Sequence, residues 1–373
     1  MSSPHDNARA WLRLLRAGVA ASALRKIVES HGSAAAALDR ARPDWRAVGA
    51  DDRAIAALRE PGLVPASDLA WLEAPGHHLI GWDDPDYPAL LRRITSPPPA
   101  LFVEGDPDLL WHPQIAVVGS RNATAGGIDN ARDFSRALAG AGLVVTSGMA
   151  EGIDAAAHLA ALEANAPTIA VVGTGTDIAY PRNHAGLAAR IRAGGAIVGE
   201  FPPGTQARRE HFPSRNRLIA GLALGTLVIE AADRSGALIT ARLAGDAGRE
   251  VFAVPGSIHN PLARGCHRLI RQGAALVEDA REVITALAPV AAELADALRA
   301  RLADAGTADP ACAPVAAPDP DHARVLAALG HDPVALDVLV QRTGLTVAQL
   351  SSMLLLMELQ GLVSAEHGRY ARR

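Results

Sequence analysis

Residues 114–122 read QIAVVGSRN, a short apolar run that ends in Gly-Ser-Arg. The side chains from Ile115 to Val118 are all apolar, which is typical of a parallel strand covered by helices on both faces. A helix-length amphipathic segment follows from Gly126. A strand, a glycine turn and a helix N-terminus in this order present backbone N–H groups to an anion. The stretch therefore predicts one βα unit with a loop suited to a phosphate.

Five more apolar runs alternate with helix-length segments downstream of this unit, at residues 143–145, 168–172, 196–198, 227–229 and 251–254. This alternation predicts an α/β fold with a Rossmann-like, doubly wound parallel sheet over residues 113–287. Ligands of such sheets bind beyond the carboxyl ends of the strands. We therefore expect the functional residues in the loops that follow the strands.

The remaining chain divides into four segments. Residues 1–78 carry short helical patterns interrupted by glycine and predict a small helical domain. Residues 79–112 include a Pro-Pro-Pro run and predict an extended connector that packs on the core. Residues 288–320 are rich in Ala and Pro and predict a linker, and residues 321–373 resemble a winged helix-turn-helix.

The loops after the strands supply the candidate binding residues. Glycine lets a ligand approach the backbone closely, whereas Arg, Ser, Thr and Asn side chains can hydrogen-bond a phosphate. The set consists of Gly119, Ser120, Arg121, Ser147, Gly148, Gly173, Thr174, Gly175, Arg182, Asn183, Phe212, Arg215, Asn216, Arg217, Ser235 and Gly236. Neither the first nor the third loop matches the dinucleotide pattern GxGxxG.

Charge is distributed unevenly along a chain whose net charge is −4. Residues 113–285 carry 17 Arg against 15 acidic residues, a net charge of +2, while each flank has a net charge of −3. Within 205–217, four Arg face one acid, and Phe212 lies among them. Bases stacked on an aromatic ring and phosphates held by Arg are features of sequence-tolerant single-strand binding. The alternative is a solvated basic loop with Phe212 in the core.

Asp154 and His158 are four residues apart on one expected helix. They could form an acid/base pair, but we favour a structural role in orienting the preceding loop. The sequence lacks GxxxxGK[ST] and GxSxG, and no loop offers a nucleophile, a base and an orienting group together. We therefore predict no catalytic residues, no metal and no cofactor.

The ends of the chain and its cysteines bear on location. The first residues lack the basic and apolar regions of a signal peptide, and no uncharged run is long enough to span a membrane. The two cysteines, Cys266 and Cys312, have no CxxC or paired-His spacing around them. These features predict a soluble cytoplasmic protein without a membrane partner.

A series of long motifs resembles the DprA/Smf family of DNA-processing proteins. They are VVGSR, SGMAEGIDAAAH, GTGTDIAYPRN, FPSRNRLIAGLA, VIEAADRSGALIT, GREVFAVPGS and NPLARGCHRLIRQGA, in this order. The helical region resembles the family's SAM-like domain, and the tail resembles its winged-helix domain. Met149 stands where the family usually has Leu, and Gly18-Val19-Ala20 departs from the commoner Gly-Val-Gly.

The resemblance implies a single-stranded DNA-binding protein without catalysis. Such a protein protects incoming DNA and helps to load the recombinase RecA during natural transformation and recombination. The central domain would bind the strand and form a homodimer. Carried over by motif, Arg121 and Arg182 would be the main DNA contacts, with residues 212–217 beside them.

Two other classes of protein remain as alternatives. One is a nucleotide-processing enzyme of the phosphoribohydrolase type, although Pro203-Gly204-Thr205 lacks the glycine pair of that family's PGGxGT motif. The other is a transcription factor that binds duplex DNA through the winged helix. Its expected recognition helix, residues 346–360, contains no Lys or Arg, which argues against this reading.

Overall fold

The computed structural model describes residues 4–40 and 45–305. From residue 325 onward it describes 325, 328–329, 334–346, 350, 353–354, 363–366 and 369–372. The chain forms two compact units, residues 1–300 and 301–373.

The first unit is organised around one nine-stranded sheet of order β1-β2-β6-β5-β4-β3-β7-β8-β9. From β6 to β9 every neighbouring pair is parallel, whereas β1 and β2 are antiparallel additions at one edge. The strands are β1 (His77–Gly81), β2 (Ala100–Gly105), β3 (Gln114–Val118), β4 (Val144–Ser147), β5 (Thr168–Val172), β6 (Ala196–Gly199), β7 (Gly225–Val228), β8 (Glu250–Ala253) and β9 (Ala275–Leu276). All six predicted strands are confirmed, and the strand order reverses between β3 and β7.

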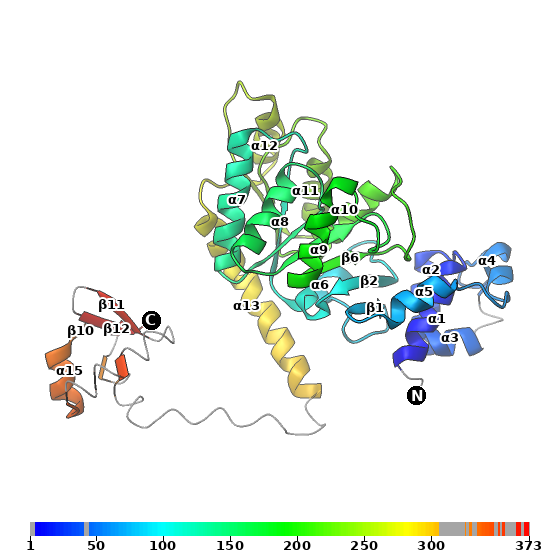
Figure 1. Ribbon diagram of the computed structural model, residues 1–373, viewed down its shortest axis with the longest axis horizontal. Coiled ribbons are helices and arrows are strands. Elements are labelled where there is room, and N and C mark those ends of the chain that lie inside the picture. The colour runs from blue at the N-terminus through cyan, green and yellow to red at the C-terminus, as the bar shows by residue number, and fades with distance from the viewer. Residues whose placement is uncertain are drawn as a thin grey trace. The chain divides into compact units, whose positions relative to one another are not determined.

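Helices cover both faces of the sheet, as a doubly wound fold requires (Figure 1). Ile115 and Val117 face one core, and Ala116 and Val118 face the other. The first face is covered by α7 (Ala125–Gly140), α8 (Ile153–Glu163), α9 (Ala185–Gly194) and α13 (Ala280–Ala305). The opposite face is covered by α6 (Ala89–Arg92), α10 (His211–Leu222), α11 (Gly236–Asp246) and α12 (Arg264–Arg271).

The expected connector, residues 79–112, is more regular than the sequence suggested. It contributes most of β1, the whole of β2, helix α6 and a 3-10 turn at Pro107–Trp111. Leu101, Phe102 and Val103 are fully buried in β2, which pairs with β6. The segment therefore packs on the core as predicted, but it does so by extending the sheet.

The N-terminal helices share a core with the edge of the sheet. They are α1 (Pro4–Arg16), α2 (Ala21–His31), α3 (Ala34–Arg40), α4 (Asp52–Ala57) and α5 (Ala66–Glu73). Trp11, Leu24 and Ile27 are buried together with Leu79 and Phe102 of the two edge strands. The predicted helices at 1–78 are present, and they belong to the same compact unit as the sheet.

The predicted linker at 288–320 differs from the structure in its first part. Helix α13 continues to Ala305 with Pro289 inside it, and Leu287 and Leu294 are buried against the sheet. Ala is the strongest helix former, so an Ala-rich segment can continue a helix as readily as it can form a linker. Residues 306–320 lie outside the described residues.

The second unit has a small core of its own. Strands β10 (Val334–Ala335), β12 (Arg369–Arg372) and β11 (Val363–Glu366) form a sheet in this order beside helix α15 (Leu336–Thr343). Its buried residues include Val325, Leu339, Leu350 and Leu354. Most of the expected recognition helix, 346–360, lies outside the described residues.

Candidate nucleic-acid interface

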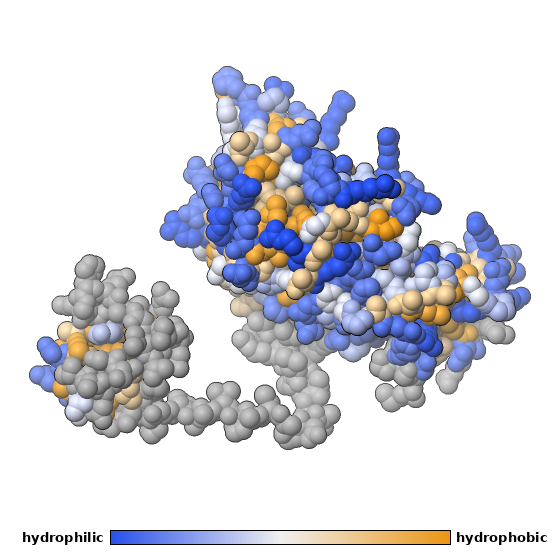
Figure 2. Space-filling model, in the orientation of Figure 1, coloured by the Kyte–Doolittle hydropathy of each residue, from blue (hydrophilic) through white to orange (hydrophobic). Residues whose placement is uncertain are grey.

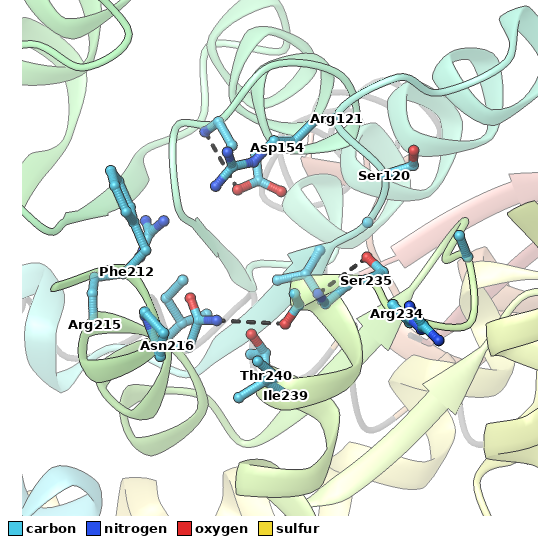
Figure 3. A pocket seen from close by; sticks show the side chains of 18 of the residues that line it. Ser120, Arg121, Asp154, Phe212, Arg215, Asn216, Arg234, Ser235, Ile239 and Thr240 are labelled. Atoms are coloured by element: carbon cyan, nitrogen blue, oxygen red, sulfur yellow. Dashed lines mark hydrogen bonds between the residues drawn. The ribbon is translucent and has the colours of Figure 1, made fainter. Parts of the chain in front are cut away.

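A cavity of about 450 Å³ opens at the point where the strand order reverses. It lies between the loop after β3, helix α10 and the start of α11 (Figure 3). Doubly wound sheets bind their ligands at this position. The predicted residues that line it are Gly119, Ser120, Arg121, Phe212, Arg215, Asn216, Ser235 and Gly236.

A smaller cavity of about 80 Å³ adjoins the first and shares Arg121, Phe212 and Arg215 with it. Gly148 and Tyr180 also line it, and the chain continues from Tyr180 to Arg182. The loops after β3, β4 and β5 therefore meet around Arg121. We define the strand-end surface as residues 119–122, 148–151, 180–183, 212–216 and 234–236.

Two aromatic rings lie beside a cation on the strand-end surface. The rings of Tyr180 and Phe212 are 5.3 Å apart between centroids, and Cζ of Arg121 lies 5.7 Å from the Phe212 centroid. Tyr180 is 43% exposed, and Phe212 is partly exposed rather than buried in the core. Figure 2 shows hydrophilic residues over most of the visible face, with smaller apolar areas between them. The rings of Tyr180 and Phe212 are accessible enough to provide a stacking platform for bases.

Exposed polar groups surround these rings. Arg121, Arg182 and Asn183 are exposed, as the sequence led us to expect of phosphate-binding residues. Arg234 is also exposed and lines the larger cavity. Arg234 was not among the binding residues predicted from the sequence. Its place after β7 was the signal that could have identified it.

Arg215 does not extend into solvent as expected for a phosphate contact. It is 4% exposed, and its Nη1 donates to the carbonyl oxygens of Gly148, at 2.6 Å, and Val171. Burial lowers its pKa to about 10, although the Asp154 carboxylate opposes this shift. Arg215 thus joins the β4 loop to the end of β5, and it forms part of the cavity wall.

Three further candidates also turn away from solvent. Arg217 pairs with Glu200, and the hydroxyls of Ser147 and Thr174 donate to the carbonyls of Val117, at 2.6 Å, and Ile178, at 2.9 Å. Because these three side chains bond within the protein, they stabilise the loops and do not form the predicted anion contacts. The sequence of a loop does not show which of its polar side chains face solvent.

The glycines of the third loop serve packing. A Cβ at Gly173 would lie 3.4 Å from the carbonyl oxygen of His211, the first residue of α10, and a Cβ at Gly175 only 2.9 Å from the carbonyl oxygen of Pro202. Both glycines are buried. They allow the loop after β5 to pack against the segment that leads into α10, so the prediction that they face a ligand is not what the structure shows.

Buried carboxylates hold the loops in shape. Asp154 accepts hydrogen bonds from the backbone N–H groups of Gly148, at 3.2 Å, and Ala150, at 3.4 Å. Burial raises the pKa of Asp154, while Arg215 and these N–H donors oppose the shift. Glu230 accepts from the N–H and hydroxyl of Thr124, at 2.9 and 2.6 Å, and from the Asn260 amide, at 3.2 Å.

His158 and Asp154 do not share a hydrogen-bond partner. Its Nδ1 is 2.7 Å from the Thr168 hydroxyl, which itself donates to the Val145 carbonyl. The Thr168 hydroxyl has only one proton, so Nδ1 of His158 must be the donor. Burial, together with Arg215 and His184, lowers the pKa of His158 to about 3. The neutral imidazole is a structural group of the core.

This burial makes the stability of the fold depend on pH. The unfolded chain binds a proton at His158 near the ordinary imidazole pKa of 6.5, whereas the folded chain does so at a pKa of about 3. The contribution of His158 to stability is therefore complete above pH 6.5 and falls as the pH decreases from 6.5 toward 3. Between these two pKa values, we expect His158 to lower the unfolding free energy by about 1.4 kcal/mol for each unit by which the pH decreases. Urea unfolding of the parent chain and of His158→Gln across this window should show a shallower slope in the variant. Equal slopes would contradict the assignment.

Among the residues described, no group of three His, Cys, Asp or Glu side chains could hold a metal ion. Within the same described residues, no helix has both the length and the apolarity needed to cross a membrane.

The fold and the strand-end surface place the chain among doubly wound α/β proteins with a basic, aromatic surface at the switch point of the sheet. The chain belongs to the DprA/Smf family. Residues 78–288 match the model for DNA recombination-mediator protein A, and residues 309–369 match the DprA winged helix domain. The resemblance to this family is therefore confirmed for the sheet domain and for the winged-helix tail.

Curated relatives cover most of the chain. Protein Smf of Escherichia coli K12 is 45% identical over 307 residues, which are 82% of this chain and 80% of that protein. DNA processing protein DprA of Streptococcus pneumoniae R6 is 46% identical over 201 residues, 54% of this chain and 71% of that protein.

Solved structures agree with this assignment. The structure of DprA from Streptococcus pneumoniae has 36% identity and a TM-score of 0.65, covering 75% of this chain and 97% of that one. A structure of DNA processing protein A from Helicobacter pylori, which concerns its single-stranded DNA binding mode, has 28% identity and a TM-score of 0.50. It covers 54% of this chain and 93% of that one.

Proposed function

We propose that this protein binds single-stranded DNA at the strand-end surface and acts as a DNA-processing protein in natural transformation. The observation that carries the proposal is the exposed Arg121 beside the rings of Phe212 and Tyr180. The Helicobacter pylori relative, with its single-stranded DNA binding mode, supports it.

The chemistry of the surface fits a flexible strand better than a duplex. Exposed guanidinium groups of Arg121, Arg182 and Arg234 can neutralise successive phosphates, while bases stack on Phe212 and Tyr180. Stacking needs bases with an accessible face, which a paired duplex does not offer. Every base has such a face, so binding should tolerate any sequence.

The proposal extends to two protein partners. Membership of the DprA/Smf family supports loading of the recombinase RecA onto the bound strand in the cytoplasm. A homodimer through the sheet domain is supported by β9, the strand at one edge of the sheet, whose Leu276 is 48% exposed. An edge strand that carries an exposed apolar side chain is suited to burial against a second copy.

The function is tested by comparing ligands on the purified full chain. Fluorescence anisotropy should show tight binding of a mixed-sequence single strand and weaker binding of the same sequence as a duplex. Nucleoside monophosphates should compete poorly, because they offer one phosphate each. Binding of the monophosphates alone, or affinity that does not change with salt, would exclude the proposed function.

We also propose that the protein is not an enzyme. The hydrogen bonds of Glu230 to Thr124 and Asn260 support a structural role for this carboxylate, which a phosphoribohydrolase-like mechanism could otherwise use. Prolonged incubation with single-stranded DNA, ATP, GTP and nucleoside monophosphates, with and without Mg²⁺, should give no turnover. Turnover that Glu230→Gln abolishes would favour the enzymatic alternative.

The winged-helix region should add little to DNA affinity. Removing the residues after Ala305 keeps α13, whose Leu287 and Leu294 complete the core of the first unit. The truncated chain should bind a single strand within about threefold of the full chain, since the exposed Arg and aromatic residues remain. Anisotropy titrations of both proteins check this. Loss of most affinity would move the DNA site to the tail, as in a duplex-binding transcription factor.

A further inference from the structure

Two ion pairs join helices α1 and α5 at the edge of the sheet. Arg9 pairs with Glu73 at 2.8 Å, and both side chains are about half exposed. Arg16 donates hydrogen bonds to both carboxylate oxygens of Asp68, at 2.6 and 2.8 Å, and Asp68 is only 1% exposed. The second pair is therefore bidentate with a buried carboxylate, whereas the first is an ordinary surface pair.

Arg16 also reaches beyond the helical region. Its Nη2 donates to the carbonyl oxygen of Pro203 at 2.8 Å. Pro203 belongs to the loop between β6 and α10, which carries Arg208 and Arg209 and leads directly to Phe212. Asp68 orients Arg16, and Arg16 bonds to the loop. Asp68 thus helps to fix the position of this loop relative to the N-terminal helices.

The loop held by Arg16 is bonded to a neighbour that carries the other aromatic ring. Gly175 N–H donates to the Thr205 carbonyl at 2.9 Å, and Gly204 N–H lies 3.0 Å from both carboxylate oxygens of Asp177. The segment that contains Gly175 and Asp177 continues to Tyr180. A shift at Pro203 would therefore be transmitted to both ring-bearing segments, those of Phe212 and Tyr180.

Helix α5 supports the same segment by a second route. Trp71 Nε1 donates to Glu104 at 2.8 Å, and Arg192 Nε donates to the other oxygen of that carboxylate. Arg192 Nη2 then donates to the Thr176 carbonyl at 2.7 Å. Asp68 is thus two hydrogen bonds away from Pro203, and Trp71 of the same helix is three hydrogen bonds away from Thr176.

We propose that Asp68 is a positioning residue for DNA binding: through Arg16 and Pro203 it holds the loops of Phe212 and Tyr180 in their binding arrangement. The proposal rests on the proposed function. Loops ordered before binding lose less conformational entropy when the strand docks, so their anchor contributes to affinity without touching DNA.

Asp68→Asn tests the proposal, because positioning and long-range electrostatics predict opposite signs. Removing a negative charge should strengthen the binding of a polyanion slightly. Loss of the anchor should instead weaken single-strand affinity, by about three- to tenfold. Glu73→Gln is the matched control: it lies on the same helix, loses the same charge and breaks an ion pair to the same helix α1, but its pair does not reach the loop. We expect its affinity to stay at or above that of the parent.

Hydrogen exchange separates positioning from a general loss of stability. In Asp68→Asn the amides of Gly175 and Gly204 should exchange faster without DNA, while amides in β3 and β4 keep their protection. Arg16→Gln, compared with Arg9→Gln, should give the same local change and provides a second variant if Asp68→Asn folds poorly. The proposal is overturned if Asp68→Asn matches Glu73→Gln in both assays, or if exchange rises equally throughout the sheet.

The binding assay and the hydrogen-exchange assay together distinguish this proposal from the proposed function. If the parent chain does not bind single-stranded DNA, the proposed function fails. Local exchange at Gly175 and Gly204 would still show whether Asp68 holds the loops.

Discussion

The double variant Arg121→Ala/Arg182→Ala is expected to bind a mixed-sequence single strand on the order of a hundredfold more weakly than the parent chain at physiological salt. Both side chains are exposed, and each can donate charge-assisted hydrogen bonds to a phosphate. Two such contacts, at roughly 1.5 kcal/mol each, account for this factor. The log–log dependence of affinity on salt should also become shallower by about 1.4, or 0.7 per phosphate released.

Arg132→Ala/Arg136→Ala is the matched control for this experiment. Both residues lie on α7, are about half exposed and pair with Asp129 and Asp133 on the same helix. Arg136 is twelve residues beyond the N-cap Thr124, about 18 Å along the helix axis. The control changes the net charge equally, so a similar loss of affinity in both variants would mean that total charge, and not the strand-end surface, governs binding.

The sequence predicted the parallel strands well because their physical signal is strong. A strand covered on both faces is mostly apolar, and β3 and β5 are apolar after their first residues, Gln114 and Thr168. The edge strands β1 and β2 were not predicted, since the neighbouring prolines favoured an irregular connector and pairing with β6 is a long-range event. Helix α13 was missed over residues 288–305 because Ala-rich sequence fits a linker and a helix alike.

The site was predicted in position more accurately than in detail. Loops at strand ends must converge, so topology could predict that the loops carrying Arg121 and Tyr180 meet, and they do. Arg215 could not be separated from them by sequence, because only packing shows that its guanidinium binds backbone carbonyls. The same holds for Asp68, whose importance depends on contacts with Arg16 and, through it, Pro203, far apart in the sequence.

Gly152 links the fold to the site, and replacing it should have the largest effect on stability. It is the N-cap of α8, with φ +76° and ψ −124°, a conformation that is strained for any residue with a Cβ. A Cβ there would lie 2.2 Å from the Ser120 carbonyl oxygen and 2.6 Å from that of Arg121. These are backbone atoms and cannot rotate away, so the loop that presents Arg121 must move.

We therefore expect Gly152→Ala to lower the unfolding free energy of the first unit by about 3–5 kcal/mol, as strain and overlap combine. It should weaken single-strand binding as well. Gly140→Ala is the control with the opposite sign: this residue ends α7, and nothing lies within 4 Å of its added Cβ. The control should stabilise the fold by about 0.4–1 kcal/mol, because the unfolded chain loses freedom. Urea unfolding measures both; a Gly152→Ala protein as stable as the parent would show that the 119–122 loop can yield, and that its shape is not fixed by α8.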